Sequence, residues 1–259
     1  MLINTLFLFL REMLPLFLFT TMVLILFFNS NLGSSLLLRS LGFGIALGLC
    51  LLPIIDSISM GLDGRGLELL FFMTTLLQMI CFLVVIIDHA EHHNRAHSLI
   101  AIILVLMSMT ASVHFISYFT VLWQTQPFSQ ALVLGTAVGV GISASLAILL
   151  YFLLRMVHQN FPLVIWYLSG WFLSAQLAVK TNLLAQIGLI DAEIVWSTEA
   201  WLSEQTVLGY LFRSLIGYEA TPIYWQLYCY LFSIGLVFFL IKLKAKNLSS
   251  FLREKKVSL

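Results

Sequence analysis

The chain has 259 residues, of which 61% are hydrophobic and only 10% charged, and its formal net charge is +1. Soluble domains carry about 25% charged residues, so this composition excludes a soluble enzyme and a disordered chain, and the near-neutral charge excludes a nucleic-acid binder. With a mean hydropathy of +1.02, the sequence predicts an all-α polytopic membrane protein embedded in a lipid bilayer.

The hydrocarbon core of a bilayer is about 30 Å thick and requires about 20 apolar residues per helix. By this measure the sequence predicts seven transmembrane helices, at about residues 5–27, 35–55, 67–87, 98–123, 129–154, 161–185 and 223–242. The first is expected to be a span and no cleaved signal peptide, because it lacks a basic start and Arg11-Glu12 interrupts its apolar run. Within this single membrane domain, an extracytoplasmic amphipathic segment, 190–222, precedes the last span.

Lysine and arginine residues near the ends of the spans predict the orientation of the chain. The tail at 243–259 should be cytoplasmic, because it and the end of the last span carry a dense set of basic residues: Lys242, Lys244, Lys246, Arg253, Lys255 and Lys256. Seven spans then place the N-terminus outside. The compact chain and its short loops favour a bacterial inner membrane.

The first six spans resemble two copies of a three-helix unit, residues 1–97 and 98–189. Spans 1 and 4 both carry polar side chains within the membrane, and spans 2 and 5 carry spaced glycines: Gly42, Gly44 and Gly48 against Gly135, Gly139 and Gly141. A unit with an odd number of spans is inverted in its second copy, and such inverted repeats are common in transporters. The alternative is that helical bundles often contain glycine-rich spans, which pack closely without any repeat.

Charged side chains inside a membrane normally face the bundle interior and have a partner there. Arg11 and Glu12 lie within the first span, and because adjacent helical residues point about 100° apart, we expect each to find its partner on another helix. Glu68, at the outer end of span 3, is a candidate partner of Arg11 or of Glu12. These residues form either a cation site or proton relay, or a structural ion pair that holds the bundle together.

Lys180 is expected to extend from the outer end of span 6 to the membrane interface. His114, deep in span 4, is expected to be a hydrogen-bonded interior residue or a metal ligand. His89 and His93 have helical spacing in a polar stretch between spans 3 and 4. They form either a solvated turn or a cytoplasmic metal acceptor.

The amphipathic segment contains a predicted helix that begins at a cap on Ser203 and ends at Gly217. Its apolar face is expected to lie on the outer membrane surface or to pack against the bundle.

In this region the chain resembles the high-affinity iron permease family, the oxidase-dependent ferric iron transporters. The resemblance is carried by Leu202-Ser203-Glu204, Leu208-Gly209, Leu211, Gly217-Tyr218, Pro222 and Tyr230. It covers most of the chain at low similarity and is sharp over roughly residues 160–240. The resemblance implies seven spans, an outside N-terminus and an inverted three-plus-three repeat followed by a seventh span.

The family carries an Arg-Glu-x-x-Glu motif in span 1 and again in span 4, where the glutamates present oxygen ligands to iron. Here the first motif is Arg11-Glu12-Met13-Leu14-Pro15, so the second glutamate is replaced by proline. The second motif position is occupied by His114-Phe115-Ile116-Ser117-Tyr118, and the family's His-Glu near the end of span 6 by Leu183-Leu184. The chain therefore resembles a diverged member of this family with degraded motifs.

The first functional hypothesis is an iron-permease-like transporter that moves iron or a related metal cation through a midplane site. Glu12 would be the retained ligand, oriented by Arg11, with His114, Tyr118 and Glu68 supplying the other donors. Mixed nitrogen and oxygen donors shift the preference from Fe(III) towards Fe(II) or another divalent ion.

Iron would be cargo, and the sequence indicates no resident cofactor. The resemblance implies a periplasmic metal-delivery or redox protein as partner, and it leaves oligomerisation open. The second hypothesis is a transport-inactive subunit that docks such a partner on the helix at 195–218. An enzyme is not expected, because no nucleophile–base pair, metal-water motif or cofactor fingerprint is present.

Overall fold

The computed structural model describes the chain except residues 1, 28–33, 89–92, 126–129, 205 and 258–259. At 2–10, 34, 93–94, 122–123, 125, 130–133, 207 and 245–257 it describes the backbone alone. The long helices are α1 (Leu2–Leu26), α2 (Ser34–Leu51), α4 (Gly66–Asp88), α5 (His93–Thr125), α6 (Gln130–Asn160), α7 (Pro162–Gln186) and α9 (Tyr224–Val257). Short helices η1 (Leu52–Ile54), α3 (Ile55–Met60) and α8 (Val207–Ile216) connect or cover them.

The all-helical class is confirmed, and six helices among the described residues, against the seven predicted, are long and apolar enough to cross a membrane. They are α2 continued by η1 and α3, then α4, α5, α6, α7 and α9. Six of the seven predicted spans overlap these helices, and 161–185, for example, corresponds to Pro162–Gln186. The predicted first span, 5–27, is not among the six, and the span predicted at 129–154 lies at Leu134–Asn160. Pro162 lies at the start of α7, where its missing N–H costs no helical hydrogen bond.

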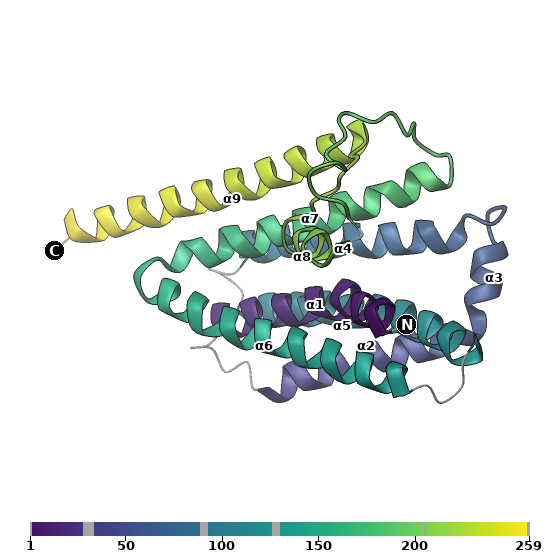
Figure 1. Ribbon diagram of the computed structural model, residues 1–259. Coiled ribbons are helices and arrows are strands. Elements are labelled where there is room, and N and C mark those ends of the chain that lie inside the picture. Colours follow the sequence, from purple (N-terminus) through teal and green to yellow (C-terminus); the bar gives the residue numbers. More distant parts are fainter. Residues whose placement is uncertain (1, 28–33, 89–92, 126–129, 205, 258–259) are drawn as a thin grey trace.

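The bundle is arranged in helix pairs. α1 packs along α6, α2 packs along α5, and α4 contacts both α5 and α7, while α9 lies along α7 (Figure 1). The core is apolar and comes from α1, α4, α5 and α7, with fully buried side chains such as Phe19, Phe82, Ile103 and Leu173. These four helices are therefore the interior of the bundle.

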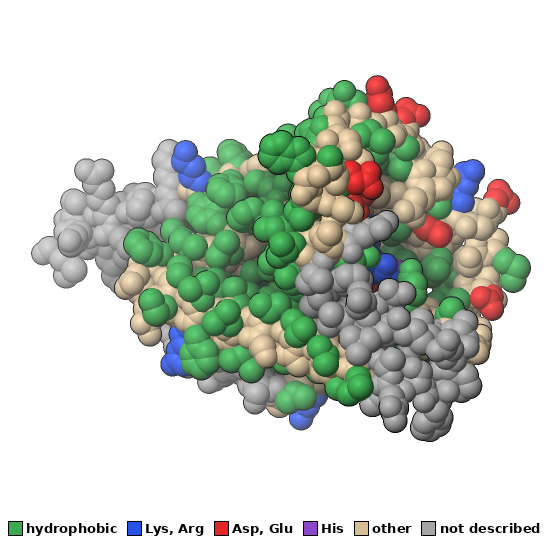
Figure 2. Space-filling view, in the orientation of Figure 1, with side chains coloured by type: hydrophobic (Ala, Val, Ile, Leu, Met, Phe, Trp, Pro, Cys, Tyr) green, Lys and Arg blue, Asp and Glu red, His purple; other side chains and the backbone are tan. Residues whose placement is uncertain are grey.

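The remaining helices present apolar side chains outward, as a lipid-facing surface requires. Leu38 and Phe43 on α2, Leu149 and Phe152 on α6, and Phe232 on α9 are all exposed. Figure 2 shows hydrophobic side chains over much of this face, with acidic side chains gathered toward the end that carries α3 and the loop after α7. This surface is consistent with a multi-pass protein in contact with lipid.

Two glycines of α2 allow the close approach of α5. A Cβ at Gly44 would lie 1.9 Å from Ser108 Oγ, and one at Gly48 would lie 2.0 Å from Ser112 Oγ. The four-residue spacing on both helices forms the contact of small residues by which membrane helices pack. A Cβ at Gly42, by contrast, would meet nothing within 4 Å, so only two of the three predicted glycines act in this way.

The predicted helix of the amphipathic segment is confirmed at its end and wrong at its start. α8 begins after Thr206, whose side chain accepts a hydrogen bond from the backbone N–H of Gly209. Ser203 lies outside the helix, and its backbone carbonyl accepts a hydrogen bond from the Thr206 hydroxyl. Gly217 ends the helix with a φ of 70°, a conformation that strongly favours glycine. α8 contacts α1 and α7, so it packs against the bundle.

Candidate functional site

A polar cavity of about 300 Å³ lies in the interior of the bundle. Its wall is formed by α1, α4, α5 and α7, and α8 contributes Arg213 and Ser214. Four charged side chains line it: Arg11, Glu12, Lys180 and Arg213. Three of the four predicted metal ligands also lie on this wall, namely Glu12, His114 and Tyr118.

Arg11 and Glu12 form an ion pair with each other, so the expectation that each would need a partner on another helix was wrong. Arg11 Nε lies 2.7 Å from Glu12 Oε1. The guanidinium also lies over the Tyr118 ring, 4.7 Å from its centroid. The expectation failed because it considered only where the two side chains leave the helix. These directions differ by about 100°, but the arginine side chain is long enough to bend back to its neighbour.

Pro15 lies one turn after Arg11 and lines the same cavity. Proline has no N–H, so the backbone carbonyl of Arg11 receives no helical hydrogen bond from residue 15. Pro15 therefore leaves the Arg11 carbonyl oxygen without its usual helical hydrogen bond in this part of α1.

Lys180 lines the cavity and does not extend to the interface, contrary to the sequence-based expectation. Its Nζ lies 3.3 Å from His114 Nε2 and 5.6 Å from the centroid of the Phe71 ring. The His114 ring packs on Phe71 with a centroid separation of 4.1 Å. Hydropathy alone could not separate the two outcomes, because the rotation of α7 decides which way the lysine points.

Glu68 lies apart from the other predicted ligands. It is in the first turn of α4 and is not on the cavity wall. Its Oε2 is buried and has no hydrogen-bond partner among the residues that the structure describes. His89 lies outside the described residues, as does the side chain of His93, so the predicted cytoplasmic acceptor stays a prediction.

Within the described ranges, no group of three or more His, Cys, Asp and Glu side chains is arranged to hold a metal ion. In the cavity, the donors Glu12 and His114 are in contact with Arg11 and Lys180 respectively. A metal ion that binds here would have to displace the Arg11 guanidinium from Glu12 and the Lys180 ammonium from His114.

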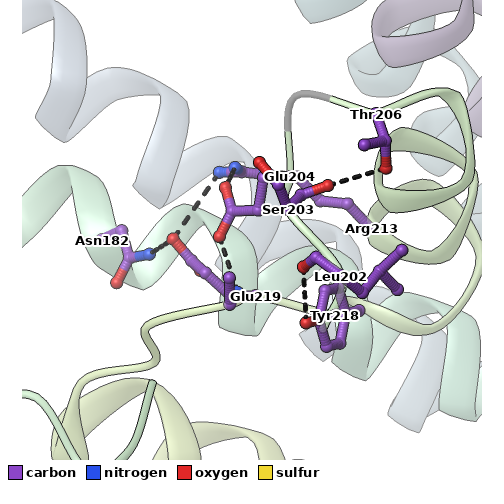
Figure 3. Close-up of polar contacts among 9 residues, drawn as sticks. Asn182, Leu202, Ser203, Glu204, Thr206, Arg213, Tyr218 and Glu219 are labelled. Atoms are coloured by element: carbon purple, nitrogen blue, oxygen red, sulfur yellow. Dashed lines mark hydrogen bonds and ion pairs between the residues drawn. The ribbon is translucent and has the colours of Figure 1, made fainter. Parts of the chain in front are cut away.

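A second polar cluster lies beside the cavity, and we call it the outer ion cluster: Asn182, Glu204, Arg213 and Glu219 (Figure 3). Arg213 lies 2.5 Å from Glu204 Oε2 and 3.8 Å from Glu219 Oε1. Glu204 Oε1 accepts a hydrogen bond of 2.7 Å from the Ala220 N–H, and the Asn182 amide donates to Glu219. Sequence reasoning missed this cluster, although its acids and arginine lie in the polar segment that it singled out.

The outer ion cluster has a distinct electrostatic character at Glu219. Burial raises the pKa of the Glu219 carboxyl above its ordinary value, and the nearby Glu204 carboxylate raises it further, while Arg213 opposes both effects. Glu219 Oε2 and Asn182 Oδ1 are buried acceptors without a partner in the described part of the chain. The Glu219 carboxyl therefore takes up a proton more readily than an ordinary exposed carboxyl.

Several contacts hold α8 against one end of the cavity. Gln176 of α7 donates a 3.0 Å hydrogen bond to the Ser214 carbonyl, and Tyr230 of α9 donates one of 3.0 Å to the Ile216 carbonyl. A Cβ at Gly217 would lie 3.0 Å from Ala175, so α8 ends in close contact with α7. The outer ion cluster and these bonds together fix α8 as a cover over the cavity.

Comparison of the chain with protein-family models, with curated proteins and with solved structures gave no match.

Proposed function

We propose that the chain is a membrane transporter that moves a small charged solute through the cavity between α1, α4, α5 and α7. The observation that carries the proposal is the cavity itself, which brings together Arg11, Glu12 and Lys180 from the long helices of an apolar bundle and Arg213 from α8. Ionisable residues inside a membrane are costly and typically mark the path of a substrate or ion.

The arrangement of the helices supports an inverted repeat. Exchanging α1 with α5, α2 with α6 and α4 with α7 converts the α1–α6 pair into the α5–α2 pair, and these two pairs have the most extensive contacts. The same exchange converts α4–α5 into α7–α1, and both pairs are in contact. The α4–α7 and α1–α5 contacts map onto themselves.

In this proposal α1 is a seventh span, because it is a continuous helix of 25 residues that packs against α5, α6 and α7. The proposal has the N-terminus outside and the C-terminus in the cytoplasm of a bacterial inner membrane, and the basic residues at the end of α9 support this orientation. The side that carries α8 and the acidic loop after α7 is then the outer side.

Iron or a related metal cation remains a prediction for the cargo. Glu12, His114 and Tyr118 support it because they share one cavity wall. Lys180 and Arg11 weigh against it, because they already contact the imidazole and the carboxylate. Iron uptake into proteoliposomes, Fe(II) against Fe(III), with Glu12→Ala as the control, tests this cargo: saturable uptake that the variant loses would support it.

Access to the cavity from both sides of the membrane tests transport without any knowledge of the cargo. Cys50, Cys81 and Cys229 are first replaced by serine, and Ala111→Cys then introduces a thiol on the cavity wall. A membrane-impermeant thiol reagent is applied to spheroplasts and to inverted vesicles. A transporter exposes its site alternately to the two sides, so we expect labelling in both preparations.

The matched control is Ala178→Cys, which lies on α7 at 1% exposure and outside the cavity wall. It should remain unlabelled in both preparations. Labelling of Ala111→Cys from one side only would contradict transport. That result would favour the alternative, a transport-inactive subunit whose exposed side chains on α8, such as Leu208 and Phe212, dock a redox or metal-handling partner.

A further inference from the structure

The Lys180 ammonium differs from the other cations of the cavity in its partners. Arg11 has the Glu12 carboxylate at 2.7 Å, and Arg213 has the Glu204 carboxylate at 2.5 Å. Across the described ranges, no carboxylate lies within the 4 Å of an ion pair from Lys180. The contacts of its ammonium are the His114 imidazole and the Phe71 ring, neither of which carries a negative charge.

A lone cation in this position requires a counter-ion. A charged group in the membrane interior is normally paired, and a buried charge without a partner is strongly destabilising. Glu12 lines the same cavity as Lys180, but its carboxylate is bonded to Arg11. The Arg11 guanidinium therefore has an ion-pair partner on this part of the wall and the Lys180 ammonium has none among the described residues.

Uncharged side chains of the wall can also bind a negatively charged ligand, because they carry hydrogen-bond donors. Gln78, Gln176 and Gln186 line the cavity, and each amide carries two N–H donors. One of those of Gln176 is bonded to the Ser214 carbonyl. A charged oxygen acceptor bonded by an ammonium and by amide N–H groups forms short, charge-assisted hydrogen bonds.

We propose that the cavity binds a small oxyanion, a carboxylate or phosphate group, with Lys180 as its counter-ion. This inference rests on the proposed transport function and names the class of its cargo. The cavity of about 300 Å³ admits a metabolite of a few carbon atoms. Binding would draw the ammonium away from His114 and onto the anion.

The test is binding by the purified full chain in detergent at constant ionic strength. The probes are inorganic phosphate, pyruvate and succinate, and the readout is the thermal unfolding midpoint as each probe is titrated. We expect at least one probe to bind the wild type saturably. Lys180→Gln should weaken that binding at least tenfold, whereas Lys180→Arg, which keeps the charge, should stay within a few fold of wild type.

Lys244→Gln is the matched control, because Lys244 is also a helical lysine but donates to the Ile86 carbonyl at 2.7 Å, outside the cavity. It should bind the probes like the wild type. Saturable binding of phosphate alone would assign a phosphate cargo, and binding of pyruvate or succinate a carboxylate cargo. No saturable binding of any probe, or equal binding by Lys180→Gln, would overturn the oxyanion site.

Failure of this inference is distinct from failure of the proposed function. Two-sided labelling of Ala111→Cys without binding of any probe would leave transport standing and remove the anionic cargo. Probe binding that depends on Lys180 with one-sided labelling would establish the site and contradict transport.

Discussion

The cavity wall and the outer ion cluster contain similar residues and differ in how completely their charges are paired. In the outer ion cluster, Arg213 lies between Glu204 and Glu219, and Glu204 also accepts a backbone hydrogen bond. On the cavity wall, Arg11 is paired with Glu12, whereas Lys180 has no carboxylate within the 4 Å of an ion pair among the described residues. Every charged side chain of the first arrangement has a partner of opposite charge within 4 Å, although Glu219 Oε2 accepts no hydrogen bond from the described part of the chain. In the second arrangement Lys180 has no such partner among the described residues.

This difference separates a structural role from a ligand-binding role. A satisfied cluster holds segments together, so changes in the outer ion cluster should lower stability. An unsatisfied charge is retained at a cost to stability and needs an outside partner, so removing it should raise stability and abolish binding.

The largest effect is expected where α8 meets α7, at Gly217. Gly217→Val would place a β-branched side chain at a φ of 70° and a Cβ within 3.0 Å of Ala175. The left-handed backbone costs about 1–2 kcal/mol and the overlap about 1–3 kcal/mol more, so the free energy of unfolding should fall by about 3 kcal/mol. Denaturant titration in detergent micelles measures this loss.

Gly188→Val is the control for this change, because Gly188 has a φ of 71° and a Cβ added there would meet nothing within 4 Å. It should lose only the backbone contribution. Equal losses in the two variants would show that the contact between α8 and α7 contributes little to stability.

The next effect concerns the outer ion cluster. Glu204→Ala removes the ion pair to Arg213 and the hydrogen bond from the Ala220 N–H. Hydrogen bonds to charged groups contribute about 1.5–3 kcal/mol, so we expect a loss of about 2 kcal/mol in the same titration. Glu199→Ala, at an exposed position of the same segment, should change stability by less than about 0.5 kcal/mol. If Glu204→Ala lost no more stability than Glu199→Ala, the outer ion cluster would not hold α8 in place.

A smaller effect of opposite sign is expected on the cavity wall. Lys180→Met keeps most of the side-chain volume and removes the cation that lacks a carboxylate partner. Replacing poorly compensated buried charge by an apolar group often stabilises, here by about 1 kcal/mol. The variant should therefore unfold at a higher temperature and bind no oxyanion. A destabilisation comparable to that of Glu204→Ala would assign Lys180 a structural role.

The smallest effect is a change in pH dependence at Glu219. Its pKa lies above the ordinary value of 4.5 in the folded chain because the carboxyl is buried. The folded state then binds a proton more tightly than the unfolded state, so the stabilisation from this group is complete below pH 4.5 and is lost as pH rises through the folded pKa. In Glu219→Gln this loss should be absent. Unfolding midpoints compared between about pH 4 and pH 8 test it, and identical profiles would contradict it.

The helices could be predicted from the sequence because hydropathy and helix-terminating residues such as glycine and proline determine them locally. The spans predicted at 67–87 and 161–185 fall on α4 and α7 within two residues, and Gly217 ends α8 as expected. Glycine spacing indicated a close helix contact at Gly44 and Gly48, but not that Gly42 would be left out of it. That distinction depends on which face of α2 meets α5.

The site was predicted in part because polar residues inside apolar helices are conspicuous in a sequence. Glu12, His114 and Tyr118 do share one cavity. The sequence could not show that Arg11 bends to Glu12 or that Lys180 turns inward to His114, because rotamers and helix rotation are set by packing between distant segments. The outer ion cluster joins residues 182, 204, 213 and 219, so it too arises only from the tertiary fold.

The pairing of Arg11 with its immediate neighbour has a consequence for how the chain enters a membrane. Each charge at the centre of a span costs about 2.5–3.5 kcal/mol on insertion scales. Because both partners are on α1 and the contact is between adjacent residues, the pair can form as soon as this turn of helix exists. In the proposed topology, the first span can leave the translocon as a neutral segment before any other helix is made. Lys180 has no such neighbour, so α7 depends on the helices synthesised before it.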